Sequence, residues 1–457
     1  MKRQKILIIT DDAIGASMAG PAIRAWNIAI LLAEHHDVRL ASTRRAAASS
    51  PHFAVCDGSG GNLGGLAAGQ DIIVLQGFTL RTHPWLLEVG AKLVIDLYDP
   101  IHLEILEGSQ DAPPAQRTAM MGVGLEALNI QLENGDFFLC ATERQRDLWL
   151  GYLSALGRVN PSTYRQDKSL RRLIDIAPFG IPDEPAPART GALRGSTPGI
   201  GPDDQLLLWA GGVYNWFDPL TLVEAVSKLV PELPRLRLVF MGTKHPSLDD
   251  LSTTVLRQAI DLARDLGVLD THVFFREGWV PYDERGRFLA DADIGVSTHY
   301  LHVETAYSFR TRMLDYLWAG LPIVCTEGDE FATLVARHGL GRAVPAEDST
   351  ALADALRELL TDAEQARRAR AAVRELAPSF TWRRVLAPLA AYCDDPWPAA
   401  DRRARFRPVA AASRPRSRFG LLTDQIRAYH EVHGLRRLLV RGSRRAVLAA
   451  LARARRR

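Results

Sequence analysis

The sequence predicts an α/β protein with two doubly wound domains that face each other across a cleft, followed by a basic helical tail. Short apolar runs rich in β-forming residues alternate with segments of helical periodicity, which is typical of parallel βαβ units. This alternation stops in the Pro- and Gly-rich residues 181–204 and then starts again. The chain has 457 residues, which is enough for two or three domains.

The composition excludes a wholly disordered or fibrous chain, because 47% of the residues are hydrophobic and 24% are charged. The net charge of +3 is unevenly distributed. Residues 401–457 hold 17 arginines, no lysine and three acidic residues, a net charge of +14, so the rest of the chain carries −11. A segment this basic indicates an anionic partner, either lipid or nucleic acid.

The four cysteines show no CxxC motif and no metal-ligand spacing, so we expect neither a disulfide framework nor a zinc site, which fits the cytoplasm. No apolar run reaches the ~18–20 residues of a membrane span. The apolar stretch near the N-terminus meets Asp11 and Asp12 too soon for a signal peptide and predicts a first strand instead.

The first half, residues 1–180, contains six predicted strands and three predicted helices. The strands are Ile6–Thr10, Val38–Ser42, Asp71–Leu75, Lys92–Asp96, Phe137–Ala141 and Ile174–Ala177, and the helices are Ala22–His35, Gln116–Leu132 and Glu143–Ser154.

After the linker at 181–204, residues 205–378 repeat the pattern. The predicted strands are Leu206–Ala210, Leu236–Met241, His272–Phe275, Ile294–Ser297, Ile323–Thr326 and Arg342–Val344. The predicted helices are Leu220–Val230, Thr253–Asp265, Tyr282–Ala290, Phe309–Trp318, Phe331–His338 and Ser349–Leu360. A further helix at Thr381–Cys393, within residues 379–395, precedes the Arg-rich residues 396–457.

Ligands of doubly wound sheets bind beyond the carboxyl ends of the strands, so the loops there are the candidate site. After the first strand, Gly20 and Pro21 lead into a helix whose N-terminus suits an anion or a sugar. In the second half, Arg310 and Arg312 lie at a predicted helix start, where guanidinium groups and free backbone N–H groups together suit a diphosphate. Asp315, one turn on, can accept hydrogen bonds from ribose hydroxyls. A solvated helix face with ordinary ion pairs is the alternative interpretation.

Several segments resemble the retaining glycosyltransferases of family 4, also called group 1, which adopt the GT-B fold. The likeness is carried by the run DYLWAGLPIVCT at residues 315–326, by LLLWAGGVYNWFDPLTLVEAV, LRLVFMGTKHP and FTWRRVLAPL, and it covers about residues 5–395 in organisation. It implies two Rossmann-like domains, a nucleotide-sugar donor on residues 205–378, an acceptor on residues 1–180 and a crossing helix at 379–395. It also implies retention of stereochemistry. The nucleotide sugar is a substrate, so we expect no cofactor and no metal.

We assign site residues within this framework. The catalytic candidates are Asp99, Glu304, Arg310 and Arg312, and the donor-binding candidates are Gly20, Gly212, Lys244, Val280, Ser308, Phe309 and Asp315. The arginines, with Lys244, would meet the charge that grows on the leaving diphosphate. Glu304 and the backbone at 308–309 would hold the donor sugar, and the Val280 backbone would contact the nucleobase. We expect Arg310→Ala to abolish transfer and to leave the fold intact.

The chain departs from the family pattern at several positions. Tyr307 stands where the family has its first glutamate, and Asp315 replaces the second. Val213 and Phe217 lie near the slots of a phosphate-binding Arg and Lys, so we expect Arg310 and Arg312 to supply that charge instead. The family's usual histidine in the first domain aligns near Tyr98, where Asp99 or His102 would replace it.

Two other patterns suggest metals. Asp291 and Asp293 form a DxD motif, but they bridge a helix end and a strand start, so a structural boundary is the favoured interpretation. His299 and His302 have no evident third ligand, and one of them can contact a sugar.

The tail interleaves arginines with Leu, Val and Ala, which is typical of a basic amphipathic helix at an anionic membrane. We therefore expect a cytoplasmic glycosyltransferase of cell-surface glycan biosynthesis, acting on a lipid-linked or polysaccharide acceptor, with residues 402–457 on the inner face of the plasma membrane. A nucleotide-sugar epimerase, a non-catalytic sugar-binding homologue and a nucleic-acid-associated protein are the alternatives. Because the tail has few aromatic residues, we expect no nucleic acid partner.

Overall fold

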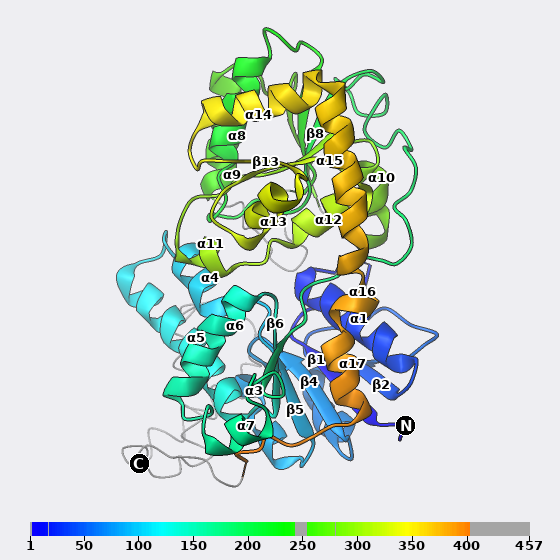
Figure 1. The fold of residues 1–457 in the computed structure, drawn as a ribbon, viewed down its shortest axis with the longest axis vertical. Helices are drawn as coiled ribbons and strands as arrows, with labels where there is room; N and C mark the ends of the chain where they lie inside the picture. The colour runs from blue at the N-terminus through cyan, green and yellow to red at the C-terminus, as the bar shows by residue number, and fades with distance from the viewer. Residues whose placement is uncertain (1, 17, 243–253, 279, 403–457) are drawn as a thin grey trace, which may run out of the picture.

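Two parallel sheets, each flanked by helices, form the two predicted domains. The computed structural model describes residues 2–16, 18–242, 254–278 and 280–402. The chain runs through the first domain, then the second, and returns to the first along one side of the molecule (Figure 1). Among these described residues, no helix is long and apolar enough to span a membrane.

The first sheet has seven strands in the order β3-β2-β1-β4-β5-β6-β7. Its strands pair in parallel, with Ile8 opposite Leu40 on one side and Val74 on the other. Helices cover both faces, so the central strands are continuous apolar runs. The sequence did not predict β3, a short edge strand with no buried residue. The strands are β1 (Lys5–Thr10), β2 (Asp37–Ser42), β3 (Ala54–Asp57), β4 (Ile72–Gln76), β5 (Lys92–Asp96), β6 (Phe137–Cys140) and β7 (Ile174–Ile176).

The helices of the first domain include the three that the sequence predicts. Pro114 begins the long helix α5, where its missing N–H costs nothing. The helices are α1 (Gly20–Ala33), α2 (Leu63–Ala67), α3 (Thr79–Thr82), α4 (Ile101–Gly108), α5 (Pro114–Asn134), α6 (Glu143–Ala155) and α7 (Pro161–Gln166), with 3₁₀ turns η1 (Ser59–Gly61) and η2 (Pro84–Glu88).

The second sheet has six strands in the order β10-β9-β8-β11-β12-β13, all paired in parallel. They are β8 (Gln205–Trp209), β9 (Leu236–Phe240), β10 (Val273–Phe275), β11 (Ile294–Ser297), β12 (Ile323–Thr326) and β13 (Gly341–Val344). The helices are α8 (Pro219–Leu229), α9 (Thr254–Asp265), α10 (Arg285–Leu289), α11 (Val303–Tyr307), α12 (Thr311–Ala319), α13 (Glu330–His338), α14 (Ser349–Thr361) and α15 (Ala363–Leu376), with 3₁₀ turns η3 (Tyr282–Glu284) and η4 (Ala377–Phe380). The predicted helix at 282–290 is thus a 3₁₀ turn followed by α10, and α15 was not predicted.

The linker at 181–204 packs on the second domain. The carboxylate of Asp291 accepts hydrogen bonds from the backbone N–H groups of Thr190, Gly191, Leu193 and Arg194, at 2.7–3.3 Å. The side chain of Leu193 is fully buried. The DxD motif therefore fastens the linker, in agreement with the structural interpretation.

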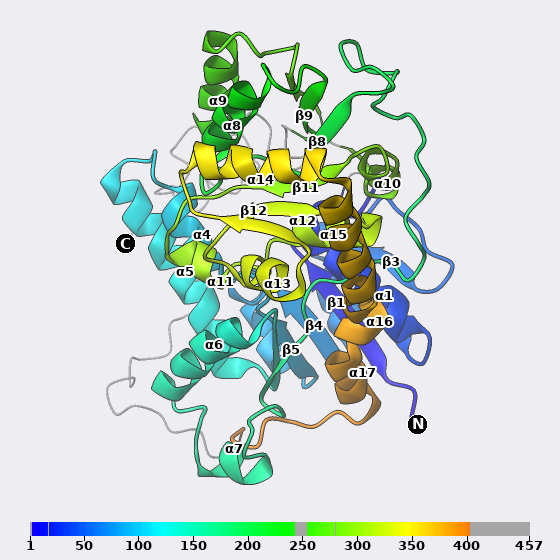
Figure 2. The ribbon, with the colours of Figure 1, turned by 45° about the horizontal axis from the view of Figure 1, so that its top comes forward.

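The chain returns to the first domain through α16 (Trp382–Val385) and α17 (Ala387–Asp394), which lie beside α1 (Figure 2). The ring of Tyr392 stacks on Phe137 of β6 with centroids 4.7 Å apart. Residues 396–402, which the sequence assigned to the tail, also pack on this domain, since the buried Asp401 carboxylate pairs with Arg158 at 2.7 Å. The rest of the predicted tail lies outside the described residues.

The strand order of each sheet reverses at one point, between β1 and β4 in the first and between β8 and β11 in the second. Such a switch point opens a crevice beyond the carboxyl ends of the strands. The loops that follow β1 and β8 therefore meet between the domains.

Candidate functional site

A cavity of about 1040 Å³ lies between the two domains, where the loops at the strand ends meet. Residues after β1 and β5, with α4 and the loop that follows it, form the first-domain wall. Residues after β8, around η3 and at the start of α12 form most of the second-domain wall. Of the predicted site residues, the cavity brings together Gly20, Asp99, Gly212, Val280, Ser308, Phe309, Arg310, Arg312 and Asp315.

Arg312 is a buried cation with no carboxylate partner among the described residues. Its guanidinium carbon lies 4.0 Å from the ring centroid of Phe217 and 4.3 Å from that of Trp209. The Nη2 atom donates to the carbonyl oxygen of Gly212 at 2.7 Å, and Nη1 has no hydrogen-bond partner in the part of the chain that the structure describes. No acidic group of the described residues lies within ion-pair distance. Burial lowers the pKa of Arg312 to about 10.

Arg310 has a different environment, because it is held by Glu304. Its Nη1 and Nη2 atoms donate to the two carboxylate oxygens of Glu304 at 2.9 and 2.7 Å, and the Ser308 hydroxyl donates to the same carboxylate. Glu304 is fully buried and does not line the cavity. We expected Glu304 to contact the donor sugar, but in this structure it fixes Arg310. The Nε atom of Arg310 has no hydrogen-bond partner among the described residues.

Phe217, at one of the positions that depart from the family pattern, contacts both arginines. Its ring centroid lies 4.9 Å from the guanidinium carbon of Arg310, as well as near Arg312. An aromatic face attracts a guanidinium group and holds it in place. The phenyl ring thus supports the cations at a position where the family has a cation of its own.

The start of α12 adds a further positive end to this wall. The helix begins at Thr311, and its N-cap residue, Arg310, makes no side-chain capping hydrogen bond. Across the cavity, α1 begins at Gly20, again without a side-chain cap. Uncapped helix N-termini present free N–H groups and a partial positive charge. A Cβ on Gly20 would meet only the Tyr98 hydroxyl at 3.8 Å, so Gly20 leaves room in the cavity and relieves no steric clash.

Asp315 lies at another part of the cavity, with Val280. Its Oδ1 atom accepts a hydrogen bond from Arg285 Nε at 2.8 Å. The guanidinium carbon of Arg285 lies 3.4 Å from the ring centroid of Tyr282, another lining residue. Arg285 and Tyr282 were missed from the sequence, although both follow Val280 closely in a loop at a strand end.

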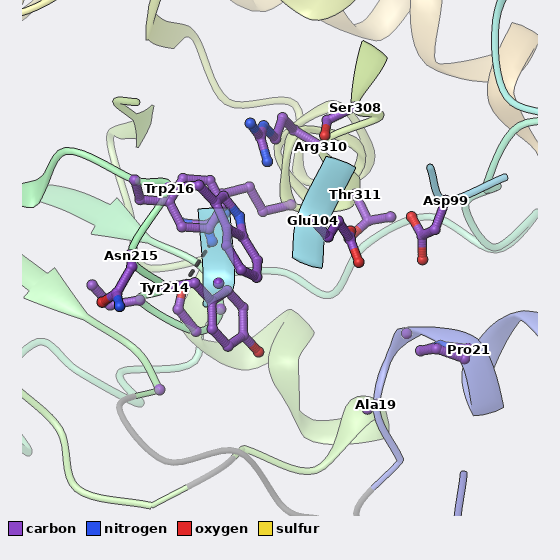
Figure 3. Close-up of a pocket in the computed structure, with 18 of the residues that line it drawn as sticks. Ala19, Pro21, Asp99, Glu104, Tyr214, Asn215, Trp216, Ser308, Arg310 and Thr311 are labelled. Atoms are coloured by element: carbon purple, nitrogen blue, oxygen red, sulfur yellow. Dashed lines mark hydrogen bonds between the residues drawn. The ribbon is translucent and has the colours of Figure 1, made fainter. Parts of the chain in front are cut away.

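The first-domain wall carries carboxylates. Asp99 and Glu104 point into the cavity near each other (Figure 3). Asp111 also lines the cavity. The Tyr98 hydroxyl hydrogen-bonds the Asp99 carboxylate, but burial outweighs this bond and raises the pKa of Asp99 to about 7. Burial and the nearby Asp99 also raise the pKa of Glu104 well above its ordinary value. Glu104 was missed because α4 was not predicted.

Aromatic residues of the loop after β8 extend across the cavity. The rings of Tyr214 and Trp216 stack with centroids 4.9 Å apart and an interplanar angle of 25°. Trp216 reaches the first domain, since a Cβ on Gly108 of α4 would lie 3.5 Å from its ring. The cluster of aromatic residues directly after a predicted strand is the sequence signal that could have identified this loop.

Hydrogen bonds also join the two domains. The Asp111 carboxylate accepts from Asn215 Nδ2 at 3.1 Å and from Thr254 Oγ1 at 2.8 Å. The Gln145 side chain of α6 donates to the carbonyl oxygen of Tyr307 at 2.7 Å. Tyr307, another departure from the family pattern, therefore contributes its backbone to the contact between the domains.

The histidines singled out in the sequence do not line the cavity. His102 is buried, its Nε2 atom lies 3.1 Å from the Tyr152 hydroxyl, and burial lowers its pKa to about 4. Burial lowers the pKa of His299 to about 3, and His302 caps α11 by accepting from the Thr305 backbone. Of the two first-domain alternatives, Asp99 faces the cavity and His102 does not. Lys244 lies outside the described residues.

No group of three or more Cys, His, Asp or Glu residues in the described part of the chain has a metal-binding arrangement. Asp293, the second acid of the DxD motif, pairs with an arginine of the linker. All four cysteines are free.

Residues 204–362 match the family model of the "Glycosyl transferases group 1". A D-inositol 3-phosphate glycosyltransferase from Stackebrandtia nassauensis is 34% identical over 186 residues, which is 40% of each chain. The match thus spans less than half the length of this curated relative.

Solved structures match more of the chain at lower identity. Sucrose-phosphate synthase from Thermosynechococcus elongatus has a TM-score of 0.61 at 16% identity, over 85% of this chain and 98% of that one. HepE from Anabaena, in complex with UDP and glucose, has a TM-score of 0.63 at 13% identity, over 86% of this chain and 100% of that one. WaaG, described as a glycosyltransferase of lipopolysaccharide biosynthesis, has a TM-score of 0.60 at 18% identity, over 87% of this chain and 98% of that one. The two-domain GT-B fold predicted from the sequence is confirmed.

Proposed function

Through residues 204–362 the chain belongs to the group 1 glycosyl transferases, and from this premise we propose that it transfers a sugar from a nucleotide-sugar donor to an acceptor hydroxyl. The donor binds along the second-domain wall of the cavity, and the acceptor enters along the first-domain wall.

The observation that carries this proposal is Arg312, a buried guanidinium group at the cavity wall with no carboxylate partner among the described residues. An uncompensated buried charge costs several kcal/mol, so such a group is retained where a ligand brings the opposite charge. The diphosphate of a nucleotide sugar brings that charge to the start of α12, where free N–H groups add to the attraction.

The residues around this position suit the departure of a diphosphate. As the bond between the sugar and the diphosphate breaks, negative charge grows on the leaving oxygen and the sugar gains oxocarbenium character. Cations and helix N-termini that are already in place stabilise the growing charge without reorganising. Arg312 and the N-terminus of α12 act in this way, and Glu304 holds Arg310 beside them. The N-terminus of α1 approaches from the other domain.

The nucleoside lies near Val280, Asp315 and the Arg285–Tyr282 pair. Arg285 donates a hydrogen bond to one carboxylate oxygen of Asp315, and the carboxylate accepts hydrogen bonds from the ribose hydroxyls on its remaining side. We propose a uridine nucleotide, because the solved HepE complexes contain UDP and UDP-glucose.

A panel of nucleoside diphosphates in a thermal-shift assay, followed by measurement of UDP released from UDP-sugars, tests this function. We expect one nucleotide, UDP, to raise the Tm, and the UDP-sugar that is the donor to be consumed when an acceptor is added. No response to any nucleotide, together with no donor consumption, would refute the proposal.

We further propose that transfer retains the anomeric configuration and requires no metal. The resemblance to retaining enzymes supports retention, and the arginines supply charge that a metal would otherwise bring. Proton NMR of the first-formed product measures the anomeric configuration. Full activity in excess EDTA is expected, and loss of activity that Mg²⁺ or Mn²⁺ restores would contradict metal independence.

We also propose that the protein acts in the cytoplasm on a lipid-linked or polysaccharide acceptor of the cell surface, and that the Arg-rich residues 403–457 bind an anionic membrane. At ~1 kcal/mol per cation near an anionic surface, several arginines suffice for binding at low salt. Liposome sedimentation of the full chain and of residues 1–402, which keep the Asp401–Arg158 pair, tests this. We expect only the full chain to sediment with anionic vesicles, and equal sedimentation of both would remove the membrane proposal.

A further inference from the structure

The two walls of the cavity have opposite charge. The cationic lining residues of the described chain all belong to the second domain: Arg257, Arg285, Arg310 and Arg312. The first-domain lining contributes Asp99, Glu104 and Asp111 and, within the described residues, no lysine, arginine or histidine. The acceptor substrate would therefore meet carboxyl groups, which accept hydrogen bonds and carry negative charge when ionised.

Glu104 is the least engaged of these carboxylates. It projects from α4 into the cavity beside Asp99, and its carboxylate makes no hydrogen bond to any described residue (Figure 3). Asp111, by contrast, is already held by Asn215 and Thr254. The carboxylate of Glu104 is thus available to a ligand that donates hydrogen bonds.

A second observation points to a ligand at the same place. The Nε atom of Arg310 is buried and has no hydrogen-bond partner within residues 2–16, 18–242, 254–278 and 280–402, although the Arg310 side chain is only 5% exposed and lines the cavity. Burying a donor without a hydrogen bond is energetically unfavourable. Trp216 offers an aromatic face between the two walls, and aromatic faces with a few polar groups are typical of small-molecule sites.

Resting on the proposed transferase function, we propose that the acceptor is an uncharged sugar, and that the first-domain wall rejects acceptors that carry a phosphate near the accepting hydroxyl. The hydroxyls of the acceptor donate to Glu104 and Asp99, and the apolar face of its ring lies against Trp216.

Electrostatic repulsion favours a neutral acceptor over one that carries a phosphate. A phosphate monoester carries about −1.5 to −2 charges at neutral pH. Placing like charges together at a binding interface costs several kcal/mol. Burial raises the pKa of Asp99 to about 7 and the pKa of Glu104 well above its ordinary value, so this wall disfavours negative charge even on its own carboxyl groups. A neutral hydroxyl avoids this cost and donates to the Glu104 carboxyl, which has no other donor among the described residues.

Matched acceptor pairs test the proposal with the full-length protein. UDP titration by calorimetry first establishes that the donor site is competent. Saturation-transfer NMR in the presence of UDP then compares methyl α-glucoside, methyl α-mannoside and myo-inositol with the phosphate ester of each. We expect at least one neutral sugar to bind, and its phosphate ester to bind at least about tenfold more weakly, a difference of ~1.4 kcal/mol.

At a pH at which Glu104 is ionised, the variant E104Q removes one charge from the wall and keeps its shape. In this variant we expect a smaller ratio between the affinities for the neutral sugar and for its phosphate ester, and an unchanged affinity for UDP. E126Q, which removes a surface carboxylate paired with Arg81 on the same domain, is the matched control and should keep the wild-type ratio.

Three outcomes overturn the proposal: equal or tighter binding of a phosphate ester, a ratio unchanged in E104Q, or UDP binding with no binding of any neutral sugar. Absence of UDP binding would instead refute the transferase function, and this inference with it.

Discussion

The two walls of the cavity carry ionisable groups of opposite sign. The second-domain wall exposes guanidinium groups and the start of α12 to the cavity, and the first-domain wall exposes carboxylates. Within the first domain, the buried Arg24 is fully used, because Asp96 accepts from it at 2.6 and 2.9 Å and it does not line the cavity. Arg312 is also buried but has no such carboxylate partner in the described chain. The comparison teaches that missing counter-charge, rather than burial, marks the residue that awaits a ligand.

The largest effect is expected where the second-domain wall has an internal ion pair. Arg310→Gln leaves the carboxylate of Glu304 buried without its counter-charge, so we expect a loss of about 3–5 kcal/mol in the free energy of unfolding. This revises the expectation that removing the Arg310 side chain leaves the fold intact. Urea denaturation measures the loss.

The double variant E304Q/R310Q is the control for this effect. It removes both charges together, so it should be more stable than R310Q alone. A single R310Q variant that is as stable as the wild type would show that the ion pair does not position the arginine.

The next largest effect is expected for Arg312, where the substitution should weaken ligand binding rather than stability. Arg312→Met removes a cation with no carboxylate partner in the described chain, so we expect no loss of stability. Charge-assisted hydrogen bonds contribute about 1.5–3 kcal/mol, so the Kd for UDP should rise by about ten- to a hundredfold. Calorimetry and urea denaturation together measure both. A large loss of stability with unchanged UDP affinity would make Arg312 a structural residue.

The smallest effect concerns the first-domain wall and depends on pH. Burial raises the pKa of Asp99 to about 7, so the folded state holds a proton that the unfolded state releases near pH 4. The stability from this group is present below pH 4 and is lost as the pH rises to 7. We therefore expect Asp99→Asn to have a higher Tm than the wild type at pH 8, and the two to converge toward pH 4. A difference in Tm that stays constant across this range would contradict the raised pKa.

Much of the fold followed from local patterns. The central strands of both sheets are apolar runs between turn residues, and Ile294–Ser297 and Ile323–Thr326 begin and end as predicted. Helix α15 was missed because its sequence is dominated by Ala, Arg and Glu and buries only Ala369 and Val373. The edge strand β3 has no buried residue to reveal it.

The site was predictable to the extent that it lies within one loop. Arg310 and Arg312 were assigned from their position at a helix start, and both line the cavity. The pairing of Arg310 with Glu304 depends on side-chain direction, which spacing alone does not give. Glu104 reaches the site only because two domains meet, and no local pattern reports a contact across such a distance in sequence.

If the second-domain wall binds a diphosphate, its affinity for uridine, UMP and UDP, measured by calorimetric titration, rises at each step, with the greatest gain at UDP. In Arg312→Met we expect smaller differences in affinity between the three ligands. Equal affinity for uridine and UDP, or unchanged differences in the variant, would show that the wall is not a diphosphate site.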